Sequence, residues 1–201
     1  KLYGAAWATI FTAGDKQDSG GIISRELETL MHAPGAPPRT IEEKEAYLSE
    51  GHSLYPEEYK KYFLAEYKYN STDYEAGCQL VAYDREHYTI TECLGVCHRY
   101  SGYGRNLPKS YRAQMAELVS NATGMNITED ELTVIANRII TLIRAFNLSR
   151  GLTREDDKPP KIYFEREPAP PRHKLDRVVF DKYLDRFYEL RGWNKEGVPT
   201  K

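Results

Sequence analysis

The chain has 201 residues, of which 40% are hydrophobic and 29% charged, with a formal net charge of −2. Its length is enough to bury a full core, and its balance of apolar and charged residues is that of a globular protein. The small net charge and the absence of long Lys/Arg runs argue against nucleic acid or an anionic membrane as a partner, because both are bound through neutralisation of phosphate charge.

The cysteine content and the opening residues bear on the compartment. Three cysteines are too few for a disulfide framework in a chain of this length, so we expect reduced thiols. No apolar run reaches the length of a membrane span, and no signal-peptide pattern opens the chain. We therefore expect a cytoplasmic protein. Because the chain opens without Met inside the apolar stretch KLYGAAWATI, we interpret residues 1–201 as the C-terminal helical part of a larger protein.

The first predicted element is a buried helix over residues 2–11, which are small and apolar. A Gly- and Asp-rich loop, residues 12–21, follows it. Loops held by a packed scaffold are common places for functional residues, so Asp18 is the candidate catalytic residue. The alternative is that this loop is a solvated polar surface.

Two helices are predicted next, over residues 40–50 and 56–69. Thr40 and Glu43 have the spacing of a capping box at the start of the first. The second places tyrosines at near-helical spacing, which is typical of a core face or a subunit face. The segment that follows contributes the expected core residues Leu80, Val81 and Tyr83, and we expect Cys78 and Cys93 to be buried small hydrophobes.

The central stretch is TECLGVCH, residues 91–98. Gly95 stands two residues before Cys97, and glycine has no Cβ and tolerates positive φ, so the backbone can approach whatever the sulfur binds. This pattern indicates a cofactor ligand. An alternative is a zinc site made of the three cysteines and His98, although only Cys93 and Cys97 have the spacing usual in zinc sites.

Two helices are predicted downstream. The first covers residues 109–121 and stops at Gly124, which supplies a left-handed C-terminal residue. The second is capped by Thr128, with Glu131 completing a capping box. Its continuous apolar face is expected to be core and consists of Leu132, Ile135, Ile139, Leu142, Ile143 and Phe146.

A charged cluster lies beyond that helix and contains Arg150, Arg154, Asp156 and Asp157. Two carboxylates could serve in general acid–base catalysis. Neighbouring arginines, however, lower carboxyl pKa values and keep the groups ionised. We therefore favour a structural ion-pair role for this cluster.

The end of the chain is predicted as a connector and a final helix. Residues 159–171 contain prolines and predict an extended surface connector. Asp176 begins the last helix, which docks through Val179, Tyr183, Phe187 and Leu190 and ends at Arg191-Gly192-Trp193. No run of alternating strands is present. The sequence thus predicts a mostly α, multi-helical C-terminal domain with long loops.

Three ordered segments resemble one known family. TECLGVCH resembles the aspartate-x-x-glycine-leucine-cysteine motif of the aldehyde:ferredoxin oxidoreductase family of tungsten enzymes, with Glu92, Gly95, Val96 and Cys97 in the matching places. The stretch IRAFNLSRGLTREDD is similar to the family's arginine-x-phenylalanine-asparagine segment and the glycine-x-threonine-arginine-x-aspartate-aspartate that follows it. FYELRGWNKEGVPT is similar to its C-terminal close.

The resemblance implies a tungsten-bispyranopterin (molybdopterin-type) cofactor beside a [4Fe–4S] cluster. Cys97 would be one thiolate ligand of that cluster, the other three coming from an upstream CxxCxxxC run that is absent here. Glu92 would accept hydrogen bonds from pterin N–H groups, and backbone groups near Leu94, Gly95 and Val96 would complete the contact. The family motif has aspartate where Glu92 stands, so the longer side chain must shift the pterin or rearrange the loop.

The resemblance also implies the kind of reaction. The family's arginine-glycine-histidine pattern is missing after Phe11, and residues 34–70 look like an insertion, which favours reduction of an aromatic acyl-coenzyme A by a benzoyl-coenzyme A reductase type of subunit. Oxidation of an aldehyde to its acid with ferredoxin as acceptor is the alternative, and a non-catalytic helical scaffold is a third. Expected partners are ferredoxin or an iron–sulfur electron-transfer subunit and a small organic substrate, in an oligomer, and the chain alone is expected to be inactive.

Overall fold

The computed structural model describes Thr40, Glu42, Glu43 and Ala46, together with residues 74–96, 109–166 and 174–200. The elements in the three longer ranges are α5 (Tyr74–Cys93), α7 (Tyr111–Thr123), α8 (Glu129–Ser149), the 3-10 helix η2 (Arg154–Asp157), α9 (Ile162–Glu165) and α10 (Arg177–Leu190). Extended pairing in these ranges is limited to an isolated bridge between Trp193 and Pro199. The predicted mostly α, multi-helical fold is confirmed.

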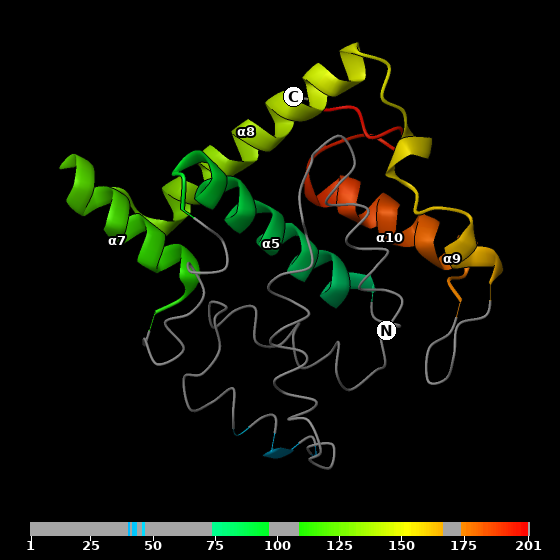
Figure 1. Ribbon diagram of the computed structural model, residues 1–201, viewed down its shortest axis with the longest axis horizontal. Helices are drawn as coiled ribbons and strands as arrows, with labels where there is room; N and C mark the ends of the chain where they lie inside the picture. Colours follow the sequence, from blue (N-terminus) through cyan, green and yellow to red (C-terminus); the bar gives the residue numbers. More distant parts are fainter. Residues whose placement is uncertain are drawn as a thin grey trace.

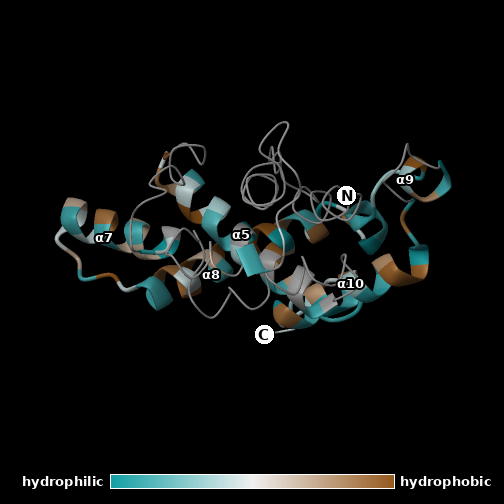
Figure 2. Ribbon diagram, turned by 90° about the horizontal axis from the view of Figure 1, so that it is seen from below, coloured by the Kyte–Doolittle hydropathy of each residue, from teal (hydrophilic) through white to brown (hydrophobic). Residues whose placement is uncertain are grey.

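Helix α5 is the central element of the described structure. In Figure 1 it crosses the molecule with α7 and α8 toward one side and α10 toward the other, and α5 contacts all three of these helices. Figure 2 shows α7 and α9 at opposite ends, with α5 between them. Side chains on every side of α5 between residues 81 and 91 are therefore buried, including polar ones: Val81, Ala82, Tyr83, Arg85, Glu86, His87, Tyr88, Thr89, Ile90 and Thr91.

The predicted helix boundaries follow from capping side chains. The Ser110 hydroxyl accepts a backbone N–H at the start of α7, which ends at Gly124 with φ 73°. Thr128 and Glu131 form the predicted capping box of α8. Asp176 caps α10 by accepting the N–H of its third residue. Each cap satisfies backbone groups that a helix end leaves without intrahelical partners.

Of the six apolar residues predicted as the core face of α8, only Leu132 is buried, while Ile139 and Ile143 are half-buried and Ile135, Leu142 and Phe146 are exposed, so the predicted face is wrong for most of its residues. The residues of α8 that are buried lie in one row at i, i+4 spacing: Leu132, Ala136, Ile140 and Arg144. Leu142 is 70% exposed and Phe146 62% exposed. Both rows of α8 are rich in apolar residues, so periodicity could not tell which one meets α5 and α7.

Helix α8, with 21 residues, is also long and apolar enough to cross a membrane. Its most apolar 18-residue stretch has a mean hydropathy of 1.2, and 22% of that stretch is buried. The sequence had predicted no run of that length. Length and composition do not separate a membrane span from a core helix. In the described structure α8 contacts α5 and α7.

The connector after η2 was predicted to be extended, but its described part is not wholly so. It contains α9, where Phe164 is buried and packs edge-on against Phe180 of α10, with 5.9 Å between the ring centroids. The backbone N–H of Leu175 donates to the carbonyl of Tyr163 at 2.8 Å. Apolar contact with α10 therefore holds this segment as a short helix.

Several predicted features lie outside the described residues. They include the helix over residues 2–11, the loop with Asp18, the stripe of residues 56–69, and Cys97. Of the earlier segments, the Thr40 and Glu43 capping box is described, with hydrogen bonds of 2.7 and 3.2 Å, and this prediction is confirmed.

Candidate cofactor-binding site

The candidate site is the C-terminal end of α5, where the helix emerges from the core. Gly95 has φ 68°, and its N–H donates to the carbonyl of Glu92 at 3.1 Å. The N–H of Val96 donates to the carbonyl of Thr91 at 2.9 Å. These two bonds and the left-handed glycine make a Schellman motif, which ends a helix and satisfies its last carbonyls.

The cap decides what this segment can offer a ligand. The N–H of Leu94 also donates to a helix carbonyl, that of Ile90, at 3.1 Å. The backbone N–H groups of Leu94, Gly95 and Val96 are thus all used within the cap. The segment therefore presents hydrogen-bond acceptors, namely the Glu92 carboxylate and backbone carbonyls, at the negative end of the helix dipole.

The geometry changes the role expected of Gly95. We had expected it to bring backbone amides close to whatever the sulfur binds, but its own N–H donates to the carbonyl of Glu92 in the cap that ends α5. Gly95 does have a positive φ. Glycine suits this position because a residue with a side chain is disfavoured in the left-handed region. Glu92, Leu94 and Gly95 are exposed and Val96 is half-buried, so the acceptor side of the segment is open to a ligand.

Of the two cysteines predicted to be buried, Cys78 and Cys93, only Cys78 is buried. Cys78 is buried, and its Sγ donates to the carbonyl of Tyr183 at 3.3 Å, as expected of a small core residue. Cys93 is exposed, so its predicted burial was wrong. It is the last residue of α5 and stands where the helix leaves its neighbours.

The positions of Cys78 and Cys93 exclude the alternative zinc site made of the three cysteines and His98. Cys78 and Cys93 are fifteen residues apart on one helix, which separates them by about 22 Å at 1.5 Å per residue. They cannot share a metal ion. Among the residues that the structure describes, no group of three or more His, Cys, Asp or Glu side chains could hold a metal.

Two charged residues that the sequence did not single out lie just before this site. Arg85 and Glu86 are both buried on α5. Burial, and then the nearby Arg191, lower the pKa of Arg85 to about 10, while the charge of Glu92 acts in the opposite direction. The available signal was a charged run, DREH, with apolar residues on both sides of it in LVAY and YTI, since charged groups are seldom buried without partners.

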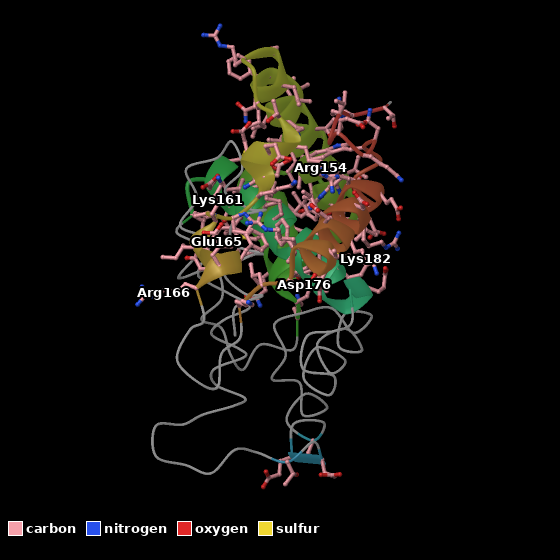
Figure 3. All side chains as sticks on the ribbon, turned by 90° about the vertical axis from the view of Figure 1, so that its right-hand side faces the viewer. Arg154, Lys161, Glu165, Arg166, Asp176 and Lys182 are labelled. Carbon is pink, nitrogen blue, oxygen red and sulfur yellow. The ribbon has the colours of Figure 1, made fainter. Side chains whose placement is uncertain are left out.

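Two residues of the downstream charged cluster, Asp157 and Arg154, form ion pairs as predicted, with partners outside the cluster. Asp157 is buried and accepts from both Nη atoms of Arg144, at 2.8 and 2.7 Å. Arg154 pairs with Asp185 of α10 at 2.7 Å, and Figure 3 shows Arg154 beside that helix. The pKa of Asp156 is lowered, chiefly because its carboxylate accepts hydrogen bonds from Thr153. The charge of Arg144 is a minor cause of that shift.

The fold and the site define a helical domain whose central helix presents acceptor groups at its exposed end. The family model described as "Aldehyde ferredoxin oxidoreductase, domains 2 & 3" matches residues 7–201. The chain therefore belongs to the aldehyde ferredoxin oxidoreductase family, which confirms the resemblance seen in its motifs.

Curated relatives and a solved structure are similar to this chain. The tungsten-containing aldehyde ferredoxin oxidoreductase of Pyrococcus furiosus is 37% identical over 87 residues, which is 42% of this chain and 14% of that protein. The enzyme of the same name from Pyrococcus horikoshii is 35% identical over 83 residues, 40% of this chain and 14% of the relative. The chain thus spans about a seventh of the length of these relatives.

The solved structure is the active-site complex BamBC of benzoyl coenzyme A reductase with 1,5-dienoyl-CoA. The similarity covers 84% of this chain and 25% of the solved chain, with 27% sequence identity and a TM-score of 0.63. The likeness extends over twice the share of this chain that the curated relatives match.

Proposed function

We propose that this chain is the C-terminal helical part of a larger oxidoreductase that holds a tungsten-bispyranopterin cofactor beside a [4Fe–4S] cluster. The observation that carries the proposal is the C-terminal end of α5, which offers a ligand hydrogen-bond acceptors because its backbone N–H groups are used within the cap. This end lies in a chain of the aldehyde ferredoxin oxidoreductase family. That end is built by Glu92, Leu94, Gly95 and Val96. The relatives' names include tungsten, and the remaining protein of such an enzyme would supply the rest of the site.

The donor and acceptor chemistry at the end of α5 suits a pterin. A pterin presents ring N–H and amino groups, which need acceptors. The Glu92 carboxylate accepts and cannot donate when ionised, and the cap leaves carbonyls as the available backbone groups. The acceptors of this segment therefore fit the donor edge of a pterin and would select against a ligand that presents only acceptors.

The cluster would take a thiolate from Cys97, because such clusters are held by cysteine thiolates. Cys97 follows the cap directly in the sequence, separated from Gly95 by one residue. The other thiolates would come from elsewhere in the larger protein. When bound, the tungsten centre and the cluster supply the redox chemistry, and this chain's residues hold and orient them.

Reduction of an aromatic acyl-coenzyme A is the reaction we favour. The likeness to the benzoyl coenzyme A reductase complex covers 84% of this chain, and the insertion at residues 34–70 favours the same assignment. An iron–sulfur electron-transfer subunit would then be the partner, in a cytoplasmic oligomer.

Aldehyde oxidation with ferredoxin as acceptor is the second candidate, since the curated relatives carry that name. The test is to purify the full-length protein anaerobically, measure tungsten and iron, and assay a panel of aldehydes against aromatic acyl-coenzyme A esters. Turnover of the esters with low-potential electrons supports our assignment. Turnover of aldehydes alone replaces it with the second candidate, and a protein free of both metals would be a non-catalytic scaffold.

Asp18 is proposed as a residue that contacts the substrate. In the full-length enzyme, Asp18→Ala is expected to reduce turnover while tungsten content and thermal stability stay unchanged. Asp15→Ala, in the same loop, is the matched control. Unchanged turnover of the Asp18 variant would return this loop to a solvated surface.

A further inference from the structure

Glu86 joins α5 to three other parts of the structure through one buried carboxylate. Its Oε2 accepts from Nη2 of Arg112, in the first turn of α7, at 2.7 Å. Its Oε1 accepts from Nδ2 of Asn137, on α8, at 2.9 Å and from Nη1 of Arg191, at the end of α10, at 3.0 Å. We call these four residues the Glu86 cluster. Both carboxylate oxygens are therefore satisfied, and each partner comes from a different helix or helix end.

The two arginines also bind the neighbouring helices and the α5 backbone. Nη1 of Arg112 donates to Oγ1 of Thr133 on α8 at 2.6 Å, and its guanidinium carbon lies 4.2 Å from the ring centroid of Tyr83. Nη2 of Arg191 donates to the carbonyl of Ala82 at 2.8 Å, while Nη1 also donates to Asn137. The cluster thus contacts α5 at residues 82, 83 and 86.

This cluster constrains α5 more tightly than apolar packing alone. An apolar contact between helices tolerates a small slide or rotation, whereas a guanidinium fork binds only in a narrow range of directions. Buried ion pairs often add little net stability over well-packed apolar residues, so a role in specifying geometry is a reason to retain one. The position of α5 along its axis is therefore set at Glu86.

The cluster lies close to the candidate site along the same rigid helix. Glu92 is six residues beyond Glu86, about 9 Å along the helix axis. Arg85 connects the two electrostatically, because the charges of both Arg191 and Glu92 act on it. A shift of α5 at Glu86 would be carried directly to the cap that holds Leu94, Gly95 and Val96.

We propose that the Glu86 cluster positions the C-terminal end of α5, so that Glu86, Arg112 and Arg191 are positioning residues for the cofactor held there. The proposal rests on the proposed function for the identity of that cofactor. None of these residues needs to contact it. They act through the helix, by fixing where the Glu92 carboxylate and the cap carbonyls are presented.

The experiment compares two buried carboxylates in the full-length, metal-loaded protein. Glu86→Gln removes the negative charge of Glu86, which both arginines face, with little change in volume. Asp157→Asn makes the same chemical change in a second buried carboxylate–arginine pair, Arg144–Asp157, which joins α8 to η2. The measurements are amide hydrogen exchange of the peptide covering residues 88–96, metal content, and the EPR spectra and reduction potentials of the metal centres.

We expect Glu86→Gln to raise exchange at Leu94, Gly95 and Val96 by about tenfold or more, since the cap opens locally, and to shift the EPR spectrum or potential. We expect Asp157→Asn to lower the melting temperature with neither change. Unaltered exchange or unaltered spectra in the Glu86 variant would overturn the proposal. So would equal changes in both variants, because they would indicate general destabilisation. Loss of tungsten from the Glu86 variant alone supports it.

A second variant covers the case in which Glu86→Gln does not fold. Arg112→Lys keeps the charge but loses the two-pronged guanidinium, and the same exchange and EPR changes are expected in smaller degree. The wild type separates this proposal from the proposed function. If it holds neither tungsten nor iron, the proposed function fails. Hydrogen exchange still decides whether the cluster fixes the end of α5.

Discussion

At the scale of single residues, Arg144 shows how one buried charge fixes the C-terminal segment. Besides Asp157, it donates from Nε to the carbonyl of Gly197 at 2.8 Å. Its guanidinium lies near the rings of Tyr188 and Trp193. The Tyr188 hydroxyl donates to Asp157, and burial raises the pKa of Tyr188 so that it stays a donor. The segment after α10 is thereby tied to α8.

Gly197 tests this arrangement. It has φ 74°, and a Cβ at this position would overlap Nη2 of Arg144 and come within 2.7 Å of the Tyr188 ring. Gly197→Ala is expected to lower the free energy of unfolding by about 2–5 kcal/mol, from left-handed strain and overpacking together. Gly192→Ala is the control, since Gly192 has φ 67° and no atom within 4 Å of its Cβ. Denaturant unfolding measures both, and equal losses would contradict the steric argument.

Cys97 and Cys93 test the proposed cluster ligand. In the full-length protein, Cys97→Ser replaces a soft thiolate by a hydroxyl, so we expect iron to be lost or the cluster potential to shift strongly. Cys93 is exposed, so Cys93→Ser is expected to change the free energy of unfolding by no more than about 0.5 kcal/mol and to leave the cluster intact. Iron content and EPR are the measurements. An empty cluster in the Cys93 variant alone would reverse the assignment.

At the scale of elements, the start of α8 shows a helix end that the sequence specifies by itself. The Thr128 hydroxyl accepts from the N–H of Glu131 at 3.2 Å, and the Glu131 carboxylate accepts from the N–H of Thr128 at 2.8 Å. Hydrogen bonds from Thr128 lower the pKa of Glu131 below its usual value of 4.5. All of the groups involved lie within four consecutive residues, so no tertiary contact is needed.

Thr128→Ala is expected to cost about 1 kcal/mol of stability near neutral pH. Because the folded-state pKa of Glu131 is lowered, its contribution is present above its unfolded pKa and is lost as the pH falls through the folded pKa. The variant keeps the backbone N–H, which is the larger cause of the shift, and loses only the hydroxyl, so the pKa of Glu131 should rise part of the way toward 4.5 and the deficit in stability should shrink in acid. NMR titration of the Glu131 carboxyl measures this. A pKa that does not rise would contradict the role of Thr128.

The two apolar rows of α8 give a second prediction at this scale. Ile140 is 3% exposed and Leu142 is 70% exposed. Ile140→Ala is expected to lower the free energy of unfolding by about 2–5 kcal/mol, and Leu142→Ala by no more than about 0.5 kcal/mol. Chemical denaturation of this chain compares them. The opposite order would mean that the row predicted from periodicity is the buried one after all.

At the scale of the whole molecule, α5 is the helix through which the others are connected. It contacts α7, α8 and α10, and Glu86 makes a polar contact with each of those helices or its end. Glu75, near the start of α5, also pairs with Arg186 of α10 at 2.5 Å. The candidate site is thus carried by the most heavily constrained helix of the described structure, which is where a cofactor contact can be held in place.

The chain by itself is not expected to hold a complete cluster. A [4Fe–4S] cluster needs four ligands, whereas this chain has three cysteines, and Cys78 is buried about 22 Å from Cys93 along α5. Anaerobic reconstitution of the 201-residue chain is expected to give well below four irons per chain. The measurement is iron content with the absorption spectrum of the product. Stoichiometric loading, with Cys97 protected from alkylation, would contradict this prediction.

The sequence alone determined the features that depend on neighbours along the chain. The caps at Thr40, Thr128 and Asp176, the glycine stops and the family motif around Glu92 are all local patterns, and local hydrogen bonding fixes them whatever lies around. Only the tertiary structure decided which row of α8 is buried and that Cys93 is exposed. It also decided that Glu86 binds Arg112, Asn137 and Arg191, which lie far from it in the sequence. Those outcomes depend on how separate helices pack, because burial and ion pairing are properties of residues brought together in space.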